Sequence, residues 1–120
     1  MARIMLATRN DEIRAYMARR FKACGHAVTR VSDYDAALTI LEETEYDLLL
    51  TTVDAENAEE LTFAKAAQQI DPDMRVMFIT GFSAVAIRRP DEPACSEDGL
   101  FGQPVHLGRL PEEVTRLVAA

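Results

Sequence analysis

Short apolar segments alternate with segments of helical periodicity along this chain. Three segments, residues 3–7, 47–52 and 75–80, are apolar on both sides of the backbone. Such runs are typical of strands buried between two layers of helices. Between them, apolar residues recur every three or four positions, which predicts helices. The helical positions are Ile13, Tyr16, Met17, Phe21 and Cys24, then Leu38 and Leu41, then Ala64, Ala67 and Ile70.

The remaining segments complete an alternation of strands and helices. Residues 26–31 alternate in polarity, which predicts an edge strand, and residues 100–102 form a weak fifth strand before a closing helix at 111–118. Strands and helices that alternate over short connections predict an α/β fold with an open, mostly parallel sheet and helices on both faces. Residues placed to begin or end helices are Asn10, Gly25 and Ser32.

Composition is that of one ordinary domain covering residues 1–120. The chain is 48% hydrophobic and 28% charged, and it has no apolar run of membrane-spanning length. Its first residues lack the pattern of a secretory signal, so we expect a cytoplasmic protein. Cys24 and Cys95 have neither metal-ligand nor redox spacing, which predicts two reduced thiols.

Charge is distributed unevenly along the chain. The formal net charge of −7 argues against nucleic-acid binding, which favours clustered lysine and arginine. Residues 1–30 hold seven basic and two acidic side chains, whereas residues 31–60 hold ten acidic and no basic ones. The pattern predicts an electrostatically polarised molecule, and we favour two solvated faces over a docking surface.

Parallel α/β sheets bind ligands beyond the carboxyl ends of their strands. Residues 8–10, 52–54, 80–81 and 103–104 follow the predicted strands and should therefore converge. No glycine-rich phosphate-binding motif is present, and His26 and His106 have no second metal ligand at useful spacing. Nucleotide binding and histidine-based metal binding therefore have no support.

Several short motifs resemble those of receiver domains of bacterial two-component systems, most of all the single-domain receivers of the CpdR type. They are Met1-Ala2-Arg3-Ile4, Leu48-Leu49-Leu50-Thr51, Asp71-Pro72-Asp73, Met77-Phe78-Ile79-Thr80-Gly81-Phe82, Ala84-Val85-Ala86 and Pro104-Val105-His106-Leu107. The resemblance covers almost the whole chain. It implies a CheY-like (flavodoxin-like) doubly wound fold: a five-stranded parallel sheet of order 2-1-3-4-5, helices on both faces, and here a shortened or irregular fourth helix.

The resemblance also implies a phosphorylation site that this sequence lacks. Receivers hold Mg²⁺ with acidic residues after the first strand, and they carry an aspartate after the third, a hydroxyl after the fourth and a lysine after the fifth. Only Thr80 and the following Pro104 match, and Asp54 stands two residues too late to be the acceptor. The predicted degenerate pocket consists of Arg9, Asn10, Thr52, Asp54, Thr80 and Gln103. We expect no Mg²⁺, no other cofactor and no catalytic residue.

Arg9 is the most consequential substitution, because a guanidinium cannot ligate a metal ion. We hypothesise that it replaces the cation and pairs with Asp54 or Glu56; the alternative is a solvated arginine. Thr52 is a poor nucleophile without a base, and Thr80 is expected to satisfy backbone groups.

The segment after residue 80 is the candidate docking surface. Residues 81–87 form a short apolar run, and two prolines follow within residues 88–99. The resemblance implies that partners dock on the fourth helix, fifth strand and fifth helix. The candidate anchors are Phe82, Val85, Ile87, Leu100 and Phe101; alternatively, the first three belong to the core. Leu100 stands where many receivers carry a switching aromatic residue, so that switch is predicted to be absent.

These observations predict a pseudo-receiver: a non-enzymatic, phosphorylation-independent interaction or adaptor module in bacterial signal transduction. The resemblance implies a protein partner, which could be a regulatory protein, a histidine kinase, a phosphotransferase or a ClpX-type AAA+ protease component linked to regulated proteolysis. No nucleic acid, membrane or Mg²⁺ is expected. Two alternatives stay open: phosphorylation at Asp11, Asp54 or Thr52, and a small-ligand sensor that uses the altered pocket.

Overall fold

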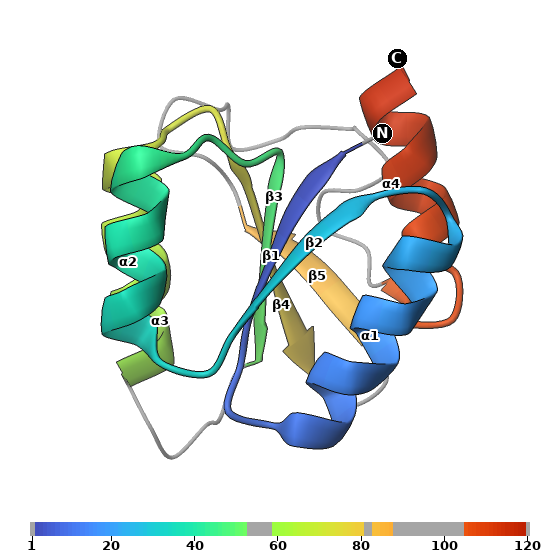
Figure 1. The fold of residues 1–120 in the computed structure, drawn as a ribbon, viewed down its shortest axis with the longest axis horizontal. Coiled ribbons are helices and arrows are strands. Elements are labelled where there is room, and N and C mark those ends of the chain that lie inside the picture. The colour runs from blue at the N-terminus through green and yellow to red at the C-terminus, as the bar shows by residue number, and fades with distance from the viewer. Residues whose placement is uncertain (1, 53–58, 81–82, 88–104, 120) are drawn as a thin grey trace.

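The computed structural model describes residues 2–52, 59–80, 83–87 and 105–119, and strands alternate with helices through most of these ranges. The elements are β1 (Arg3–Ala7), α1 (Asp11–Ala23), β2 (Ala27–Val31), α2 (Tyr34–Glu43), β3 (Leu48–Thr52), α3 (Glu59–Ile70), β4 (Arg75–Thr80), β5 (Ser83–Ile87), β6 (Val105–His106) and α4 (Leu110–Ala119). Figure 1 shows a twisted central sheet with α1 and α4 on one side and α2 and α3 on the other. The predicted doubly wound α/β arrangement is confirmed.

Within the described ranges, the sheet has six strands in the order β2-β1-β3-β4-β5-β6. Strands β1 to β4 pair in parallel, which confirms the predicted order 2-1-3-4. The other edge differs from the prediction of a fully parallel five-stranded sheet, because β5 and β6 run antiparallel to their neighbours. The weak strand predicted at 100–102 lies outside the described residues.

Strand β5 occupies the segment in which a shortened or irregular fourth helix was predicted. Thr80 pairs with Ser83 and Phe78 pairs with Val85, so the chain reverses after β4 and runs back along it. Two residues suffice for such a reversal, whereas a parallel crossover needs a dozen or more. The five-residue run is also too short to form a stable helix alone, and its β-branched Val85 and Ile87 favour a strand.

Strands β1 and β3 bury side chains on both of their faces. Ile4 and Leu6 on β1 join the hydrophobic cluster formed with α1 and α4, whereas Met5 joins the cluster formed with α2 and α3. Leu50 and Leu49 on β3 divide in the same way, and all five side chains are at most 1% exposed. Each buried side chain of this size contributes about 1.5–3 kcal/mol. These contacts confirm both segments as central strands.

Helix boundaries follow local capping chemistry. The side chain of Asn10 accepts a hydrogen bond from an N–H group in the first turn of α1, as predicted. Gly25 follows the end of α1 with a φ of +86°, a conformation that glycine adopts without strain. The predicted cap Ser32 is wrong by one residue, because Asp33 caps α2 and accepts from the N–H of Asp35. A carboxylate at this position also suits the positive end of the helix dipole.

His26 ties the start of the sheet to α4. The residue is 6% exposed, and the Nδ1 of its ring accepts a hydrogen bond from the backbone N–H of Ala2 at 2.9 Å. The ring proton therefore lies on Nε2, which donates to Oγ1 of Thr115 at 2.8 Å. Thr115 in turn donates to the carbonyl of Pro111. These hydrogen bonds give His26 a structural role.

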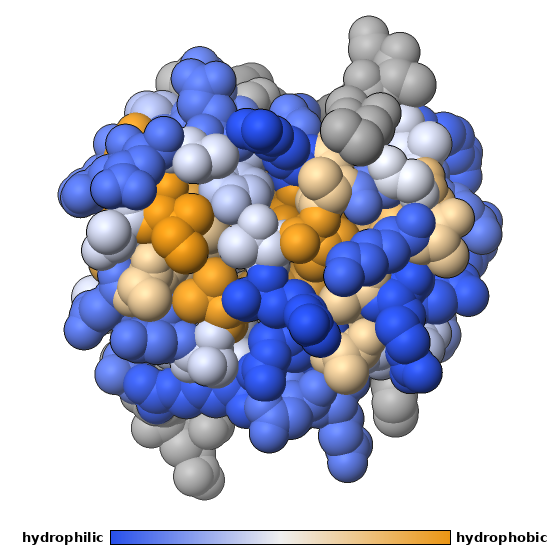
Figure 2. Space-filling view, viewed as in Figure 1, coloured by the Kyte–Doolittle hydropathy of each residue, from blue (hydrophilic) through white to orange (hydrophobic). Residues whose placement is uncertain are grey.

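The face seen in Figure 2 is largely hydrophilic, and its apolar side chains form small separate patches. Among the described residues, Tyr16 and Leu61 are the large hydrophobic side chains that are exposed. None of the helices in these ranges combines the length and apolar character needed to cross a membrane. Because these patches are small and separate, the face seen in Figure 2 offers no extended apolar surface.

Candidate functional site

Several of the predicted pocket residues lie at the carboxyl ends of β1, β3 and β4, a surface that we call the crown. We define the crown by Thr8, Arg9, Asn10, Thr52 and Thr80. Parallel pairing of the three strands brings these chain segments to one end of the sheet. Asp54 and Gln103, the other predicted pocket residues, lie outside the described residues.

Arg9 contacts two helices that are far from it in the sequence. Its Nη1 lies 3.0 Å from Oε2 of Glu59, the first residue of α3. Its Cζ lies 5.1 Å from the centroid of the ring of Tyr34, the first residue of α2, within the range of a cation–π contact. The predicted partners Asp54 and Glu56 are not among the described residues. Arg9 is therefore paired, and the carboxylate it contacts is Glu59.

The side chain of Tyr34 is buried and held in place by packing rather than exposed on the surface. It is 5% exposed, and its ring stacks on that of Phe63 with a centroid distance of 4.7 Å. Burial raises the pKa of the Tyr34 phenol above its ordinary value, and the neighbouring Glu60 carboxylate raises it further. The hydroxyls of Tyr34 and Thr51 are buried close to each other, but no partner among the described residues meets hydrogen-bond geometry. The protonated phenol is thus the favoured form.

The hydroxyl of Thr52 takes part in a local hydrogen-bond network. Oγ1 of Thr52 lies 2.9 Å from Oγ1 of Thr8, which also accepts from the backbone N–H of Asn10 at 3.1 Å. The carbonyl of Thr8 accepts from the guanidinium of Arg14 at 2.7 Å. These contacts hold the turn between β1 and α1 against the end of β3. Within the described ranges, they give Thr52 no basic partner that could activate its hydroxyl.

The donor set of the crown does not fit the Mg²⁺ that receivers hold. Arg9 has no acceptor atom, and the side-chain oxygen of Asn10 already caps α1. Mg²⁺ binds most often through carboxylates, and Asp11, which follows Asn10, instead pairs with Arg14. The part of the chain that the structure describes contains no cluster of histidine, cysteine, aspartate or glutamate suited to a metal ion.

Residues predicted to anchor a partner are only partly described. Val85 is half-buried on β5, opposite Phe78 of β4, and Ile87 lies opposite Val76 in the same pairing. They therefore lie on a strand of the sheet rather than on a helix. Phe82, Leu100 and Phe101 lie outside the described residues, and the docking role of this segment stays a prediction.

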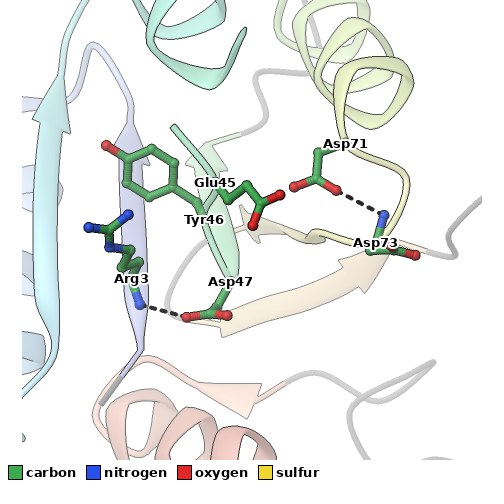
Figure 3. Close-up of a pocket in the computed structure, with 6 residues that line it drawn as sticks. All are labelled: Arg3, Glu45, Tyr46, Asp47, Asp71 and Asp73. Carbon is green, nitrogen blue, oxygen red and sulfur yellow. Dashed lines mark hydrogen bonds between the residues drawn. The ribbon is translucent and has the colours of Figure 1, made fainter. Parts of the chain in front are cut away.

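A hollow of about 330 Å³ lies at the opposite, amino-terminal end of the strands (Figure 3). We call this end the rim, and its lining residues are Arg3, Glu45, Tyr46, Asp47, Asp71 and Asp73. Oδ2 of Asp47 accepts from the backbone N–H of Arg3 at 2.8 Å, and Oδ1 of Asp71 accepts from that of Asp73 at 3.2 Å. These two carboxylates thus hold turns and strand starts in place.

Tyr34 and Glu59 are the site residues that sequence reasoning missed, whereas Thr8 belongs to the segment 8–10 that was expected there. The acidic first turn of α3 was a usable signal, because an acidic residue there follows soon after the end of β3 in the sequence. Nothing local distinguishes Tyr34, which is 25 positions from Arg9 in the sequence. Its role follows from the packing of α2 beside the end of β1.

Comparisons with known proteins agree with this architecture. No family model matches the chain. The response regulator receiver protein CpdR of Brucella abortus (strain 2308) is 33% identical to it over 120 residues, which span 100% of this chain and 99% of that protein. The crystal structure of the receiver domain from the hybrid histidine kinase CckA is 29% identical with a TM-score of 0.66, covering 95% of this chain and 96% of that one.

A third comparison concerns the fold alone. The structure of a transiently phosphorylated switch in bacterial signal transduction superposes with a TM-score of 0.70 at 17% identity. The match covers 98% of this chain and 94% of that one. The similarity extends over the whole α/β architecture and carries no information about the residues of the crown.

Proposed function

The chain belongs to the response regulator receiver family of two-component signalling, and from this premise we propose that it is a receiver without phosphate-based switching. In this proposal it is not an enzyme, and it acts as a phosphorylation-independent protein-interaction or adaptor module. The observation that carries the proposal is the guanidinium of Arg9, paired with Glu59 at 3.0 Å, at the strand end where receivers bind Mg²⁺.

Electrostatics support this proposal. Phosphoryl transfer to a receiver depends on a divalent ion that neutralises charge on the transferred group. A unit positive charge about 4 Å from a divalent cation opposes it by several kcal/mol, even at an effective dielectric constant of about 20. A guanidinium also cannot lose its proton to relieve that repulsion. Arg9 therefore disfavours the ion on which the chemistry depends.

The residue at the acceptor position supports the same proposal. Thr52 carries an alkyl hydroxyl, which is a weak nucleophile unless a base removes its proton. Its described contact is the hydroxyl of Thr8 at 2.9 Å, which is not a base at neutral pH. Asp11, an alternative acceptor, pairs with Arg14 at the start of α1. Neither residue resembles an activated acceptor.

The proposed partner is a protein of the signalling pathway: a histidine kinase, a phosphotransferase, another regulatory protein or an AAA+ protease component. Loss of phosphate switching removes the usual input but leaves the receiver scaffold on which partners dock. Strand β5 lies where the fourth helix was predicted, next to the edge strand β6 of the described sheet. We propose that this edge of the sheet contributes to the docking surface.

Phosphorylation chemistry tests the proposal directly. The purified chain is incubated with acetyl phosphate and Mg²⁺ and analysed by intact mass, with a receiver that retains its acceptor aspartate as positive control. We expect no acyl phosphate and no Mg²⁺-dependent change in the amide spectrum. Stoichiometric, Mg²⁺-dependent addition of phosphate would overturn the proposal, and its loss in Asp11→Asn, Asp54→Asn or Thr52→Ala would identify the acceptor.

A further inference from the structure

We infer that Tyr34 is a positioning residue that holds Arg9 as a resident cation of the crown. The two residues and Glu59 form what we call the Arg9 bridge, which joins the turn after β1 to the first residues of α2 and α3. This inference rests on the proposed function and deepens it, because it states what occupies the place of the metal ion and how that occupant is held.

The ion pair alone would not fix Arg9. The side chains of Arg9 and Glu59 are 56% and 52% exposed, and exposed pairs of this kind are weak and screened by salt. A long arginine side chain held only by such a contact would sample several rotamers. A second, rigid contact is required to keep the guanidinium in one place.

The ring of Tyr34 supplies that contact. It is itself held in place, because it is almost fully buried and stacks on Phe63 at an interplanar angle of 21°. The face of an aromatic ring is electron-rich, so it attracts a guanidinium that lies over it. Arg9 is thus placed over a surface that packs into the core shared by α2 and α3.

The ring rather than the hydroxyl carries this role. The Tyr34 hydroxyl is buried without a partner in hydrogen-bond geometry among the described residues, near Thr51 and Glu60. It makes no hydrogen bond to Arg9 in this structure. Phenylalanine should therefore preserve the position of Arg9, whereas leucine, which has no π system, should release it. This difference separates a positioning role from general packing.

The bridge has a regulatory consequence. In a receiver the cation at this place binds and leaves, whereas a guanidinium is covalently part of the chain. The turn after β1 is then held against α2 and α3 without dependence on Mg²⁺ or phosphate. The Arg9 bridge should weaken at high ionic strength through the Glu59 pair, whose side chains are 56% and 52% exposed, whereas the ring of Tyr34 stays in place because it is buried.

Ring-current shifts in NMR spectra test the inference on the intact chain. Protons on Cδ of Arg9 should resonate upfield of those of Arg19, an exposed arginine of α1 that serves as the control. Tyr34→Phe should retain the upfield shift, and Glu59→Gln should reduce it only in part. Tyr34→Leu removes the ring that generates the shift, so its loss in that variant serves to assign the shift to Tyr34. The shift of Arg19 should stay unchanged in all three variants.

A double-mutant cycle with Arg9→Gln and Tyr34→Leu gives the energetic counterpart. The coupling should correspond to roughly a 2- to 5-fold change in the unfolding equilibrium constant, the range of exposed cation–π pairs. An Arg9 shift equal to that of Arg19 in the wild type would overturn the inference, even if Tyr34→Leu failed to fold. Retention of the upfield shift in a folded Tyr34→Leu variant would overturn it as well.

The inference and the proposed function fail in different ways. Acetyl phosphate labelling would overturn the loss of phosphate switching, whatever the NMR result. An unshifted Arg9 would overturn the bridge while the chain stayed unlabelled by acetyl phosphate. Acetyl phosphate labelling therefore tests the loss of phosphate switching, and the NMR shift of Arg9 separately tests the Arg9 bridge.

Discussion

At the crown, the guanidinium of Arg9 lies against Glu59 and over the ring of Tyr34, whereas at the rim the carboxylates of Asp47 and Asp71 accept hydrogen bonds from backbone N–H groups. A receiver concentrates carboxylates at its crown to hold a metal ion. In the described part of this chain, clustered carboxylates line the hollow at the other end of the sheet. An acidic residue can help to hold a metal ion for phosphate chemistry only if it lies at the carboxyl ends of the strands. Its position in the sheet therefore matters more than the acidic content of the sequence.

The largest expected effect comes from restoring the crown to the receiver pattern. A variant with Arg9→Asp, Asn10→Asp, Thr52→Asp and Gln103→Lys should gain Mg²⁺-dependent labelling by acetyl phosphate, measured by intact mass. Thr52→Asp alone should stay unlabelled, because Arg9 still opposes the metal ion. Asp71→Asn at the rim, added to the restored variant, should have no effect. Full labelling of the single Thr52→Asp variant would show that Arg9 is no barrier.

Tyr34→Leu should cause the largest loss of stability among the single substitutions. It removes a buried ring that stacks on Phe63, so the free energy of unfolding should fall by about 2–4 kcal/mol. Urea denaturation measures the change. Tyr34→Phe is the matched control and should be nearly neutral or slightly stabilising, since it removes a buried hydroxyl without a described partner. Equal losses in both variants would assign the effect to the hydroxyl instead.

His26→Ala tests the structural role of His26 at the amino-terminal end of the sheet. It leaves the N–H of Ala2 without its acceptor and breaks the link to Thr115, so we expect a loss of about 2–3 kcal/mol in thermal or urea unfolding. His106→Ala is the matched control, because His106 is exposed and its Nδ1 accepts a local hydrogen bond from the backbone N–H of Gly108. A loss for His106→Ala as large as that for His26→Ala would contradict this assignment.

Alkaline pH should lower the free energy of unfolding through Tyr34. Burial and Glu60 raise the pKa of its phenol above 10.0, so the folded state favours the protonated form. That contribution to stability is complete below about pH 10 and is lost as the pH rises through the raised folded value. The free energy of unfolding of the wild type should therefore fall more steeply above this pH than that of Tyr34→Phe. Parallel pH profiles would refute the prediction.

Asp47→Ala at the rim should have the smallest effect. Its carboxylate accepts from the N–H of Arg3 in an exposed position, so we expect a loss of about 0.5–1 kcal/mol in urea denaturation. Asp47→Asn keeps an acceptor oxygen and should retain most of the stability. A loss above that of His26→Ala would place the main structural contact of the rim at Asp47.

The sequence predicted those elements whose buried residues form a recognisable pattern within one contiguous segment. The strands at β1, β3 and β4 and the helix cap Asn10 followed from local patterns and are present in the structure. Strand β5 was missed, because a short apolar run fits a strand or one helical turn equally well. Pairing with β4 resolved that ambiguity through backbone hydrogen bonds that only the folded sheet provides.

The sequence by itself determined that the ends of β1 and β3 carry Arg9, Asn10 and Thr52 in place of acidic residues, because strand positions and residue identities are both local properties. Only the tertiary structure decided which groups surround Arg9. Tyr34 and Glu59 reach it from the first residues of two different helices, at separations of 25 and 50 positions. Such contacts depend on how α2 and α3 pack against the sheet, and that packing is set by the whole core rather than by any local pattern.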